Sequence, residues 1–190
     1  MVKNLQPLEI ATAMRQDLFE IAVFLDDCWR TVYREIVSSD YLDSMSADAR
    51  YERLLTRFEE TPADFLIIRD ASILVGVAVF GKSNTDGYPD DGEISAIYLR
   101  HDYTGKGHGH VLFAKAEAVL AERGHAYFVL DVLSENTRAI DFYHKHGYQS
   151  VSERSIRLGE KDYPLTVFRK KNCLVADNEL GKDRTLVDMT

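Results

Sequence analysis

Cysteine, proline and tryptophan are scarce in this chain, which has 2 Cys, 4 Pro and 1 Trp among 190 residues. The two cysteines, Cys28 and Cys173, are far apart and form no metal-binding or redox spacing, so we expect two reduced thiols and no disulfide framework. Long apolar runs are missing too: no segment resembles a membrane-spanning helix, which needs roughly 18 nearly continuous apolar residues, and the N-terminus has no signal-peptide pattern. The sequence therefore predicts a cytoplasmic protein without a membrane partner.

Basic residues are outnumbered, with 23 Lys and Arg against 31 Asp and Glu and a formal net charge of -8. Because binding to nucleic-acid phosphates depends on clustered Lys and Arg, this balance argues against a nucleic-acid partner. It suits a cationic small molecule instead. The charged residues between 52 and 60, Arg57 among them, are interpreted as the solvated face of a helix.

The two common nucleotide-binding motifs are also absent, although three alternating glycines, Gly105, Gly107 and Gly109, run into an amphipathic helix. A phosphate loop needs Lys and then Ser or Thr after its last glycine, and the dinucleotide fingerprint needs a glycine at 110 or 112. Positions 110 to 112 are His, Val and Leu, so a nucleotide-binding protein is a remote alternative. The glycines still predict an anion cradle, because the first N–H groups of a helix lack partners and no Cβ blocks the approach.

The length of the chain suits one domain, since domains commonly have about 100 to 200 residues.

The sequence also predicts the helices and strands of this domain. Gly124 and Gly147 are expected to end two of the helices as left-handed caps. Periodicity and turn residues predict strands at 8–13, 64–70, 72–82, 92–99, 126–132, 148–158 and 165–170, and helices at 16–33, at 38–58 with a break near 44–46, from the glycine loop to Gly124, and at 136–146.

Two segments of the chain carry recognisable motifs. The first consists of Thr104, Gly105, Lys106, Gly107, His108 and Gly109, and the second contains Asn136, Ala139, Phe142, Tyr143, Gly147 and Tyr148. They resemble the acetyl-CoA motif Q/R-x-x-G-x-G/A and the following motif N-x-x-A-x-x-F-Y-x-x-x-G-F/Y of the GNAT superfamily of N-acyltransferases, and the resemblance covers roughly residues 8 to 170. Threonine stands where the family's first motif usually has Gln or Arg, which affects one side-chain contact to the cofactor but not the backbone cradle.

The resemblance implies a mixed α/β GNAT fold, with a mostly antiparallel sheet of six to seven strands flanked by about four helices. It also implies acetyl-CoA as co-substrate. In this family the fourth strand diverges from the fifth, and the freed backbone groups, here those of Ile97, Tyr98 and Leu99, hold the pantetheine arm and the thioester oxygen. We expect this domain to span 1–171, followed by a polar tail at 172–190 that is loosely held or docks on a partner subunit, as in a homodimer.

The resemblance further suggests the groups that carry out acyl transfer. Tyr143 is the candidate general acid for the departing thiolate, and the alternative is aromatic packing on an amphipathic helix. Asn136 is expected to contact the cofactor and to cap its helix. Glu93 is the candidate general base, acting directly or through a water; the alternatives are a substrate-binding anion and an exposed carboxylate at a strand end.

The acceptor site is expected near the N-terminal helices, where Trp29 and Tyr33 offer aromatic walls for an ammonium group. The alternative for Trp29 is a place in the core, which its position on an apolar stripe favours. A metal site is not expected, because the histidine pairs 108/110 and 144/146 are two residues apart and do not share a helix face.

These observations predict an N-acetyltransferase that moves an acetyl group from acetyl-CoA to a primary amine by direct attack in a ternary complex. A small cationic amine or polyamine is the first expectation for the acceptor. The alternatives are a catalytically silent acyl-CoA-binding module and an acetyltransferase of protein N-termini or antibiotics.

Overall fold

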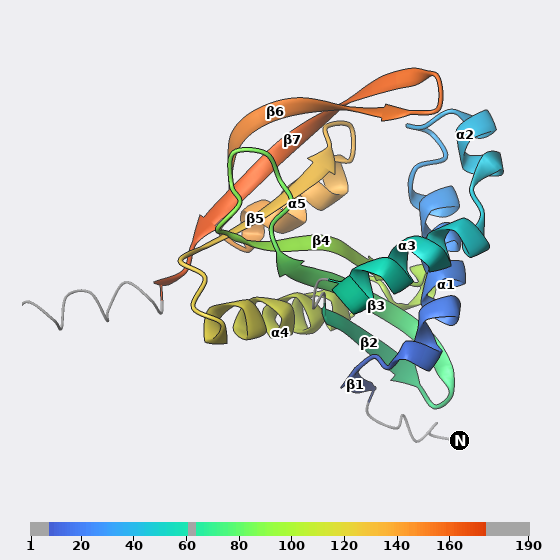
Figure 1. Ribbon diagram of the computed structural model, residues 1–190, viewed down its shortest axis with the longest axis horizontal. Helices are drawn as coiled ribbons and strands as arrows, with labels where there is room; N and C mark the ends of the chain where they lie inside the picture. Colours follow the sequence, from blue (N-terminus) through green and yellow to red (C-terminus); the bar gives the residue numbers. More distant parts are fainter. Residues whose placement is uncertain (1–7, 61–63, 174–190) are drawn as a thin grey trace, which may run out of the picture.

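A computed structural model describes residues 8–60 and 64–173, so most of the expected tail lies outside the described residues. The described chain forms one sheet and its covering helices (Figure 1). None of these helices has the length and apolar character needed to cross a membrane. In chain order the elements are β1 (Glu9–Thr12), η1 (Arg15–Asp17), α1 (Leu18–Val32), α2 (Ser39–Ser44), α3 (Ala47–Glu60), β2 (Asp64–Asp70), β3 (Ile73–Lys82), β4 (Gly92–Leu99), η2 (His101–Tyr103), α4 (His108–Glu122), β5 (Tyr127–Leu133), α5 (Thr137–Lys145), β6 (Gln149–Leu158) and β7 (Lys161–Lys171).

The sheet has seven strands in the order β1-β2-β3-β4-β5-β7-β6, and all neighbours are antiparallel except β4 and β5. The predicted fold class is therefore confirmed, with five α-helices in the described residues where about four were expected. The last strand begins at Lys161, earlier than the predicted 165, because Pro164 weakens the strand signal. Proline is tolerated there because the β5·β7 ladder ends at Leu165, so β7 pairs only with β6 at that point.

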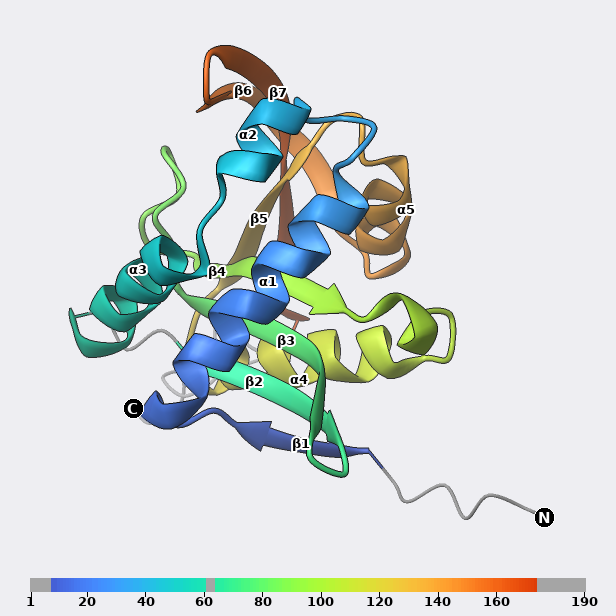
Figure 2. The same ribbon diagram turned by 90° about the vertical axis from the view of Figure 1, so that its right-hand side faces the viewer.

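The helices cover the two faces of the sheet (Figure 2). Leu18, Ile21 and Leu25 of α1 are buried with Phe65 and Val77 in a cluster on the face that α1 and α3 cover. A larger cluster fills the other face, where α4 and α5 pack; it includes Ile68, Phe80, Leu112, Phe113, Leu130, Tyr143 and Phe168. The alternating strand residues that feed these two clusters explain why the apolar pattern of β2 and β3 is nearly continuous.

Strands β4 and β5 diverge after a short stretch of parallel pairing, and this divergence positions the site. Their parallel ladder has two pairs in the described residues, Gly92 with Phe128 and Glu93 with Val129. Beyond Glu93, β4 stays paired with β3, and an extra residue, Ser95, bulges between the pairs made by Ile94 and Ala96. A bulge increases local twist, and Figure 1 shows β4 and β5 leaving their common start in different directions. The result is a wedge between the strands whose β4 wall has backbone groups open to a ligand.

Candidate active site

The glycine loop follows β4 directly and leads into α4. The N–H of Arg100 donates to Val75 O at 2.9 Å, which anchors the start of the loop to β3. Gly105 and Gly107 have φ values of 74° and 87°, a region that side chains rarely adopt. The first intrahelical bond of α4 runs from Val111 N to Gly107 O, so the N–H groups of residues 108–110 have no helical acceptor.

Open space lies in front of these N–H groups. A Cβ built on Gly105 or Gly107 would meet no other atom within 4 Å. The left-handed backbone accounts for the two glycines, and the lack of side chains there leaves the backbone accessible to an anion. The geometry fits the diphosphate cradle that the sequence predicts.

The side chains of the loop are held by the loop itself. The Thr104 hydroxyl donates to His101 O at 2.7 Å, and the Lys106 ammonium donates to Asp102 O at 2.6 Å. Lys106 also lies 5.3 Å from the centre of the Tyr103 ring. The cofactor contacts predicted for Thr104, Lys106 and His108 stay predictions.

A groove of about 420 Å³ runs from the loop along the outer side of α1. Leu99 and Thr104 form part of one wall, Cys28 lies in the α1 wall, and Arg138 of α5 also lines it. Burial raises the pKa of the Cys28 thiol to about 12, with a smaller contribution from Asp27, so this thiol is protonated and unreactive at neutral pH. Both cysteines are free, as expected.

Two phenols and an amide come together where α1 ends and α5 begins. The hydroxyls of Tyr33 and Tyr98 are 3.0 Å apart in a hydrogen bond. The Asn136 side chain hydrogen-bonds to Tyr33, while its Oδ1 accepts from Ala139 N at 3.2 Å and caps α5. The predicted cap is therefore confirmed, and Tyr33 is a buried member of this cluster with an exposure of 6%. Its predicted role as an acceptor wall stays a prediction.

Tyr143 lies on the inner face of α5, buried against Phe113, Tyr148 and Phe168. Burial, and next the nearby Tyr33 phenol, raise the pKa of Tyr143 above its usual value. The pKa of Tyr98 is raised by the same two causes, burial first. Tyr143 therefore keeps its proton at neutral pH, which a general acid requires, and it also packs in the core as the alternative held.

Glu93 is the last residue of β4 that pairs with β5, so it lies at the apex of the wedge. Its Oε2 accepts from Asn84 N at 2.7 Å and from Thr85 Oγ1 at 3.4 Å. The charge of Glu93 also acts on Arg57 of α3, whose pKa is lowered by burial and raised by Glu93. Glu93 is half-buried, and at about 3.3 Å per residue it is at most roughly 16 Å along the strand from Tyr98.

Trp29 has features of both expected roles, an aromatic wall of the acceptor site and a core residue. It is half-buried, its ring centre is 4.6 Å from that of Tyr33, and the Arg50 guanidinium lies 5.7 Å from its ring. Arg50 pairs with Asp26, a carboxylate with 2% exposure whose Oδ2 has no hydrogen-bond partner. This edge of α1 and α3 is therefore polar inside, although the apolar stripe of α1 predicts core packing.

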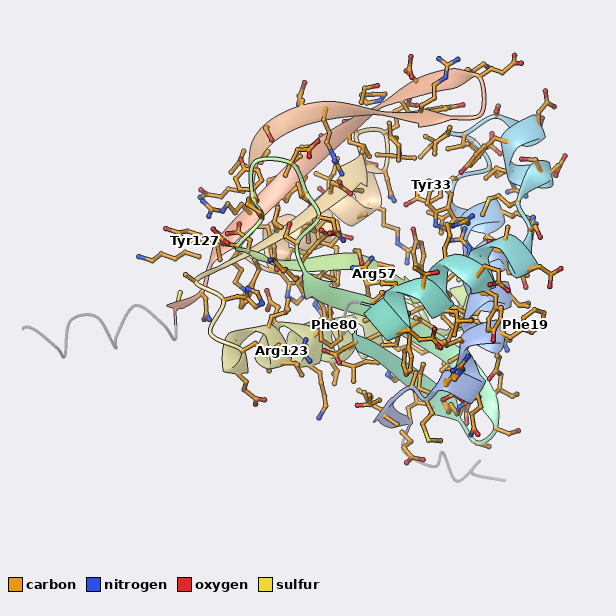
Figure 3. The ribbon with its side chains drawn as sticks, in the orientation of Figure 1. Phe19, Tyr33, Arg57, Phe80, Arg123 and Tyr127 are labelled. Atoms are coloured by element: carbon orange, nitrogen blue, oxygen red, sulfur yellow. The ribbon has the colours of Figure 1, made fainter. Side chains whose placement is uncertain are left out.

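Arg57 and Arg138 are site residues that the sequence analysis did not identify. Arg57 was expected on a solvated face, but it is half-buried and faces Glu93, and Figure 3 shows it on the side of α3 next to β4. Its spacing of seven from Arg50, which faces Asp26, was the available signal, since residues at i and i+7 share a helix face. Arg138 sits in the second family motif at a position that the motif leaves free.

The histidines form no site with three metal ligands in the described ranges. One cross-helix pair was not foreseen: His110 Nδ1 of α4 and His146 Nε2, just after α5, are 2.8 Å apart. Burial, followed by His110 and Lys170, lowers the pKa of His146 to about 4. This pair joins the two helices rather than forming a metal centre.

The comparisons with known proteins agree with this geometry. Residues 25–148 match the Acetyltransferase (GNAT) family, so the chain belongs to that family and is an acyltransferase. It is similar to the uncharacterised N-acetyltransferase YuaI of Bacillus subtilis (strain 168), with 30% identity over 151 residues, 78% of this chain and 84% of YuaI.

Two further relatives come from Thermoplasma acidophilum. Its spermidine N(1)-acetyltransferase is 24% identical over 150 residues, which is 75% of this chain and 88% of the relative. The crystal structure of its PaiA N-acetyltransferase in complex with coenzyme A has a TM-score of 0.69 and 23% identity, covering 88% of this chain and 100% of the other. That likeness shows the same fold.

Proposed function

We propose that this acetyltransferase uses acetyl-CoA to acetylate a primary amine of a small cationic acceptor, with a polyamine as the first candidate, by direct attack in a ternary complex. The observation that carries the proposal is the divergence of β4 from β5 just after Glu93. One strand thereby joins a carboxylate at the apex of the wedge to a glycine cradle at its far end. A donor and an acceptor can meet in such a wedge from opposite sides.

The donor half follows from the loop and the phenol cluster. The pyrophosphate of acetyl-CoA is held by the free N–H groups at the start of α4, and its pantetheine arm follows the backbone of Ile97, Tyr98 and Leu99. The amine nitrogen forms a bond to the acetyl carbon as the C–S bond breaks. Tyr143 then delivers its proton to the departing sulfur, which leaves as the thiol, and the proton that the attacking nitrogen loses on forming the amide restores the Tyr143 hydroxyl.

The acceptor half depends on Glu93. Its carboxylate accepts a proton from the acceptor ammonium through water, because the strand spacing keeps it several residues away from the cluster around Tyr98. The Arg57 guanidinium interacts electrostatically with Glu93 from α3. A cationic acceptor is supported by the formal net charge of -8 and by the acceptor in the name of the spermidine N(1)-acetyltransferase relative.

A panel assay tests the proposal directly. Release of free thiol from acetyl-CoA is measured with spermidine, spermine, free amino acids, aminoglycosides and short peptides with free N-termini. We expect the highest kcat/KM for a polyamine. A clear preference for peptides or aminoglycosides would replace the acceptor class, and tight acetyl-CoA binding without turnover on any amine would favour the silent acyl-CoA-binding module.

Exchange of Glu93 for glutamine tests the base. The amide oxygen of Glu93→Gln can still accept from Asn84 N, so the loop contact is retained while the proton acceptor is lost. We expect kcat/KM to fall about 10²-fold near neutral pH and the loss to shrink as pH rises and more acceptor is already deprotonated. Asp86→Asn is the matched control, an exposed acid in the same loop.

Two other outcomes of the Glu93→Gln profile would assign Glu93 a different role. Superimposable profiles of the variant and the wild type would make Glu93 a loop-holding carboxylate. A raised KM for cationic acceptors with an unchanged kcat would make it a substrate-binding anion.

A further inference from the structure

The groove beside the glycine loop contains charges of both signs, and all but one of its arginines and carboxylates are paired within the described residues. The two carboxylates of its α1 wall are matched: Glu20 lies 2.6 Å from Arg69, and Asp27 lies 3.6 Å from Arg30. Arg100 also lines the groove and pairs with Asp102 at 3.0 Å. Arg138 is exposed and has no ion pair or hydrogen bond with any described residue.

The position of Arg138 is unfavourable for its own helix. Asn136 is the N-cap of α5, so Arg138 is the second residue of the first turn, and that turn contains no acidic residue. A cation near a helix N-terminus opposes the helix dipole, and the first turn of α4, which opens at the same loop, also lacks an acid. Arg138 therefore lies at the positive end of α5 with no acidic residue in its own turn to balance it.

The glycine loop lacks a long side chain at position 104 that could contact the cofactor, and Arg138 can supply one. Position 104 is the place where the matched motif usually has Gln or Arg, and here its hydroxyl is turned back onto His101 O. The Lys106 ammonium is likewise held by Asp102 O. Thr104 and Arg138 line the same groove, so Arg138 offers a long cationic side chain to the groove where position 104 has a short one.

We propose that Arg138 binds the pyrophosphate of acetyl-CoA and takes over the contact that Thr104 is too short to make. A guanidinium presents two parallel N–H donors to a phosphate, a geometry that a backbone cradle alone does not supply. The inference rests on the proposed use of acetyl-CoA and adds a cofactor-binding residue from α5 to the site.

The test compares donors that differ in their phosphates. Binding of acetyl-CoA, its 3′-dephospho form and acetyl-pantetheine is measured by calorimetry for wild type and Arg138→Ala. We expect Arg138→Ala to weaken acetyl-CoA and its 3′-dephospho form equally, by roughly 10- to 100-fold, because charge-assisted hydrogen bonds are worth about 1.5–3 kcal/mol. Acetyl-pantetheine, which lacks the pyrophosphate, should bind both proteins with the same affinity.

Two further variants make the result specific. Arg157→Ala removes an exposed arginine that pairs with Asp162 in the β6–β7 hairpin, so it matches the charge change and should leave donor binding at the wild-type value. Adding Thr104→Arg to Arg138→Ala should restore most of the lost affinity by supplying a cation from the loop side. The melting temperature of the free Arg138→Ala protein should not fall, since the change relieves the unfavourable cation in α5.

The outcomes separate this inference from the proposed function. A loss that disappears with the 3′-dephospho donor would move Arg138 to the 3′-phosphate and overturn the pyrophosphate assignment. Unchanged affinity of Arg138→Ala for acetyl-CoA would overturn the inference alone. Failure of the wild type to bind acetyl-CoA would overturn the proposed function itself.

Discussion

Tyr143 packs in the core through its ring, and we propose that its hydroxyl protonates the leaving thiolate. Burial among aromatic neighbours, and next the Tyr33 phenol, raise the pKa of this hydroxyl, so it is protonated at neutral pH when the thiolate forms. Packing and proton donation are therefore compatible at this position. Proton donation depends on the hydroxyl oxygen of Tyr143, while packing depends on its ring.

Tyr143→Phe separates the two roles, because it keeps the ring and removes the oxygen. If the hydroxyl protonates the leaving thiolate, kcat should fall about 10- to 1000-fold while the affinity for acetyl-CoA and the melting temperature stay near wild type. Tyr148→Phe is a useful control, since Tyr148 belongs to the same aromatic cluster and its buried hydroxyl should not affect kcat. Equal turnover of Tyr143→Phe and wild type would leave Tyr143 as a packing residue.

The structural role of a single residue could be predicted from the sequence where a motif or a helix-cap pattern identifies it. Asn136 caps α5 as expected, because Asn is a strong N-cap and the apolar pattern starts just after it. The sequence did not place Arg57, since a charged residue on a helix indicates exposure unless its partner on another element is known. Glu93 faces Arg57 from a different element, and no local pattern encodes that meeting.

Helix α4, which follows the glycine loop, is flanked at both ends by glycines with left-handed backbone. Gly107 precedes α4 with φ 87°, and Gly124 follows it with φ 84°; in both, a built Cβ would meet no atom within 4 Å. The two positions thus carry the same backbone strain for any L side chain, of about 1–2 kcal/mol. Only Gly107 lies at the cradle.

This pair gives a matched test of the cradle. Gly107→Ala and Gly124→Ala should lower the melting temperature by similar amounts, because the backbone cost is alike. Calorimetry should show at least a tenfold loss of acetyl-CoA affinity for Gly107→Ala and none for Gly124→Ala, since only the first Cβ projects into the ligand's space. Equal affinities would remove the loop from the donor site.

The contact between α4 and α5 contains the His110–His146 pair, and it makes stability depend on pH. The pKa of His146 is lowered to about 4, so between about pH 6.5 and 4 the unfolded chain binds a proton that the folded chain does not. The free energy of unfolding should therefore fall as pH drops through this window. The positive charge of Lys170 on β7 adds to the penalty, although Glu117 pairs with it at 2.8 Å.

His146→Gln should reduce this pH dependence, because it removes the group whose proton uptake differs between the two states. Urea unfolding at pH 7 and pH 4.5 measures the effect, with exposed His101→Gln as a control that keeps the wild-type difference. The same drop in stability for His146→Gln and wild type would show that other groups cause it.

At this scale the sequence predicted element types well and missed their irregularities. The alternation of β4 indicates a strand, but the extra residue at Ser95 has no local signature, because its cause is the pairing with β3. The divergence of β4 from β5 entered only through the resemblance to the family. Position within the sheet, rather than composition, decides both features.

The order of the strands is a property of the whole molecule that no local pattern contains. Strand β7 lies between β5 and β6, so the last two strands do not add to the sheet in chain order. The wedge of β4 and β5 consequently joins two halves of the fold: the antiparallel strands β1 to β4 with α1 and α3, and the strands β5 to β7 with α5. Few backbone bonds cross it, since the described β4–β5 ladder has two pairs.

A donor bound in the wedge should therefore stabilise the molecule as a whole. Any ligand that binds only the folded state adds RT ln(1 + [L]/Kd), about 2.7 kcal/mol at a hundredfold excess over Kd, and for a domain of this size that corresponds to roughly 5–10 °C in melting temperature. We expect acetyl-CoA to give a shift of this size in a single transition, because it contacts α4, α5 and β4 together. Acetyl-pantetheine at equal concentration should give a much smaller one. A shift with a polyamine alone that matches the acetyl-CoA shift would contradict the proposed site, in which the cradle and the groove hold the donor.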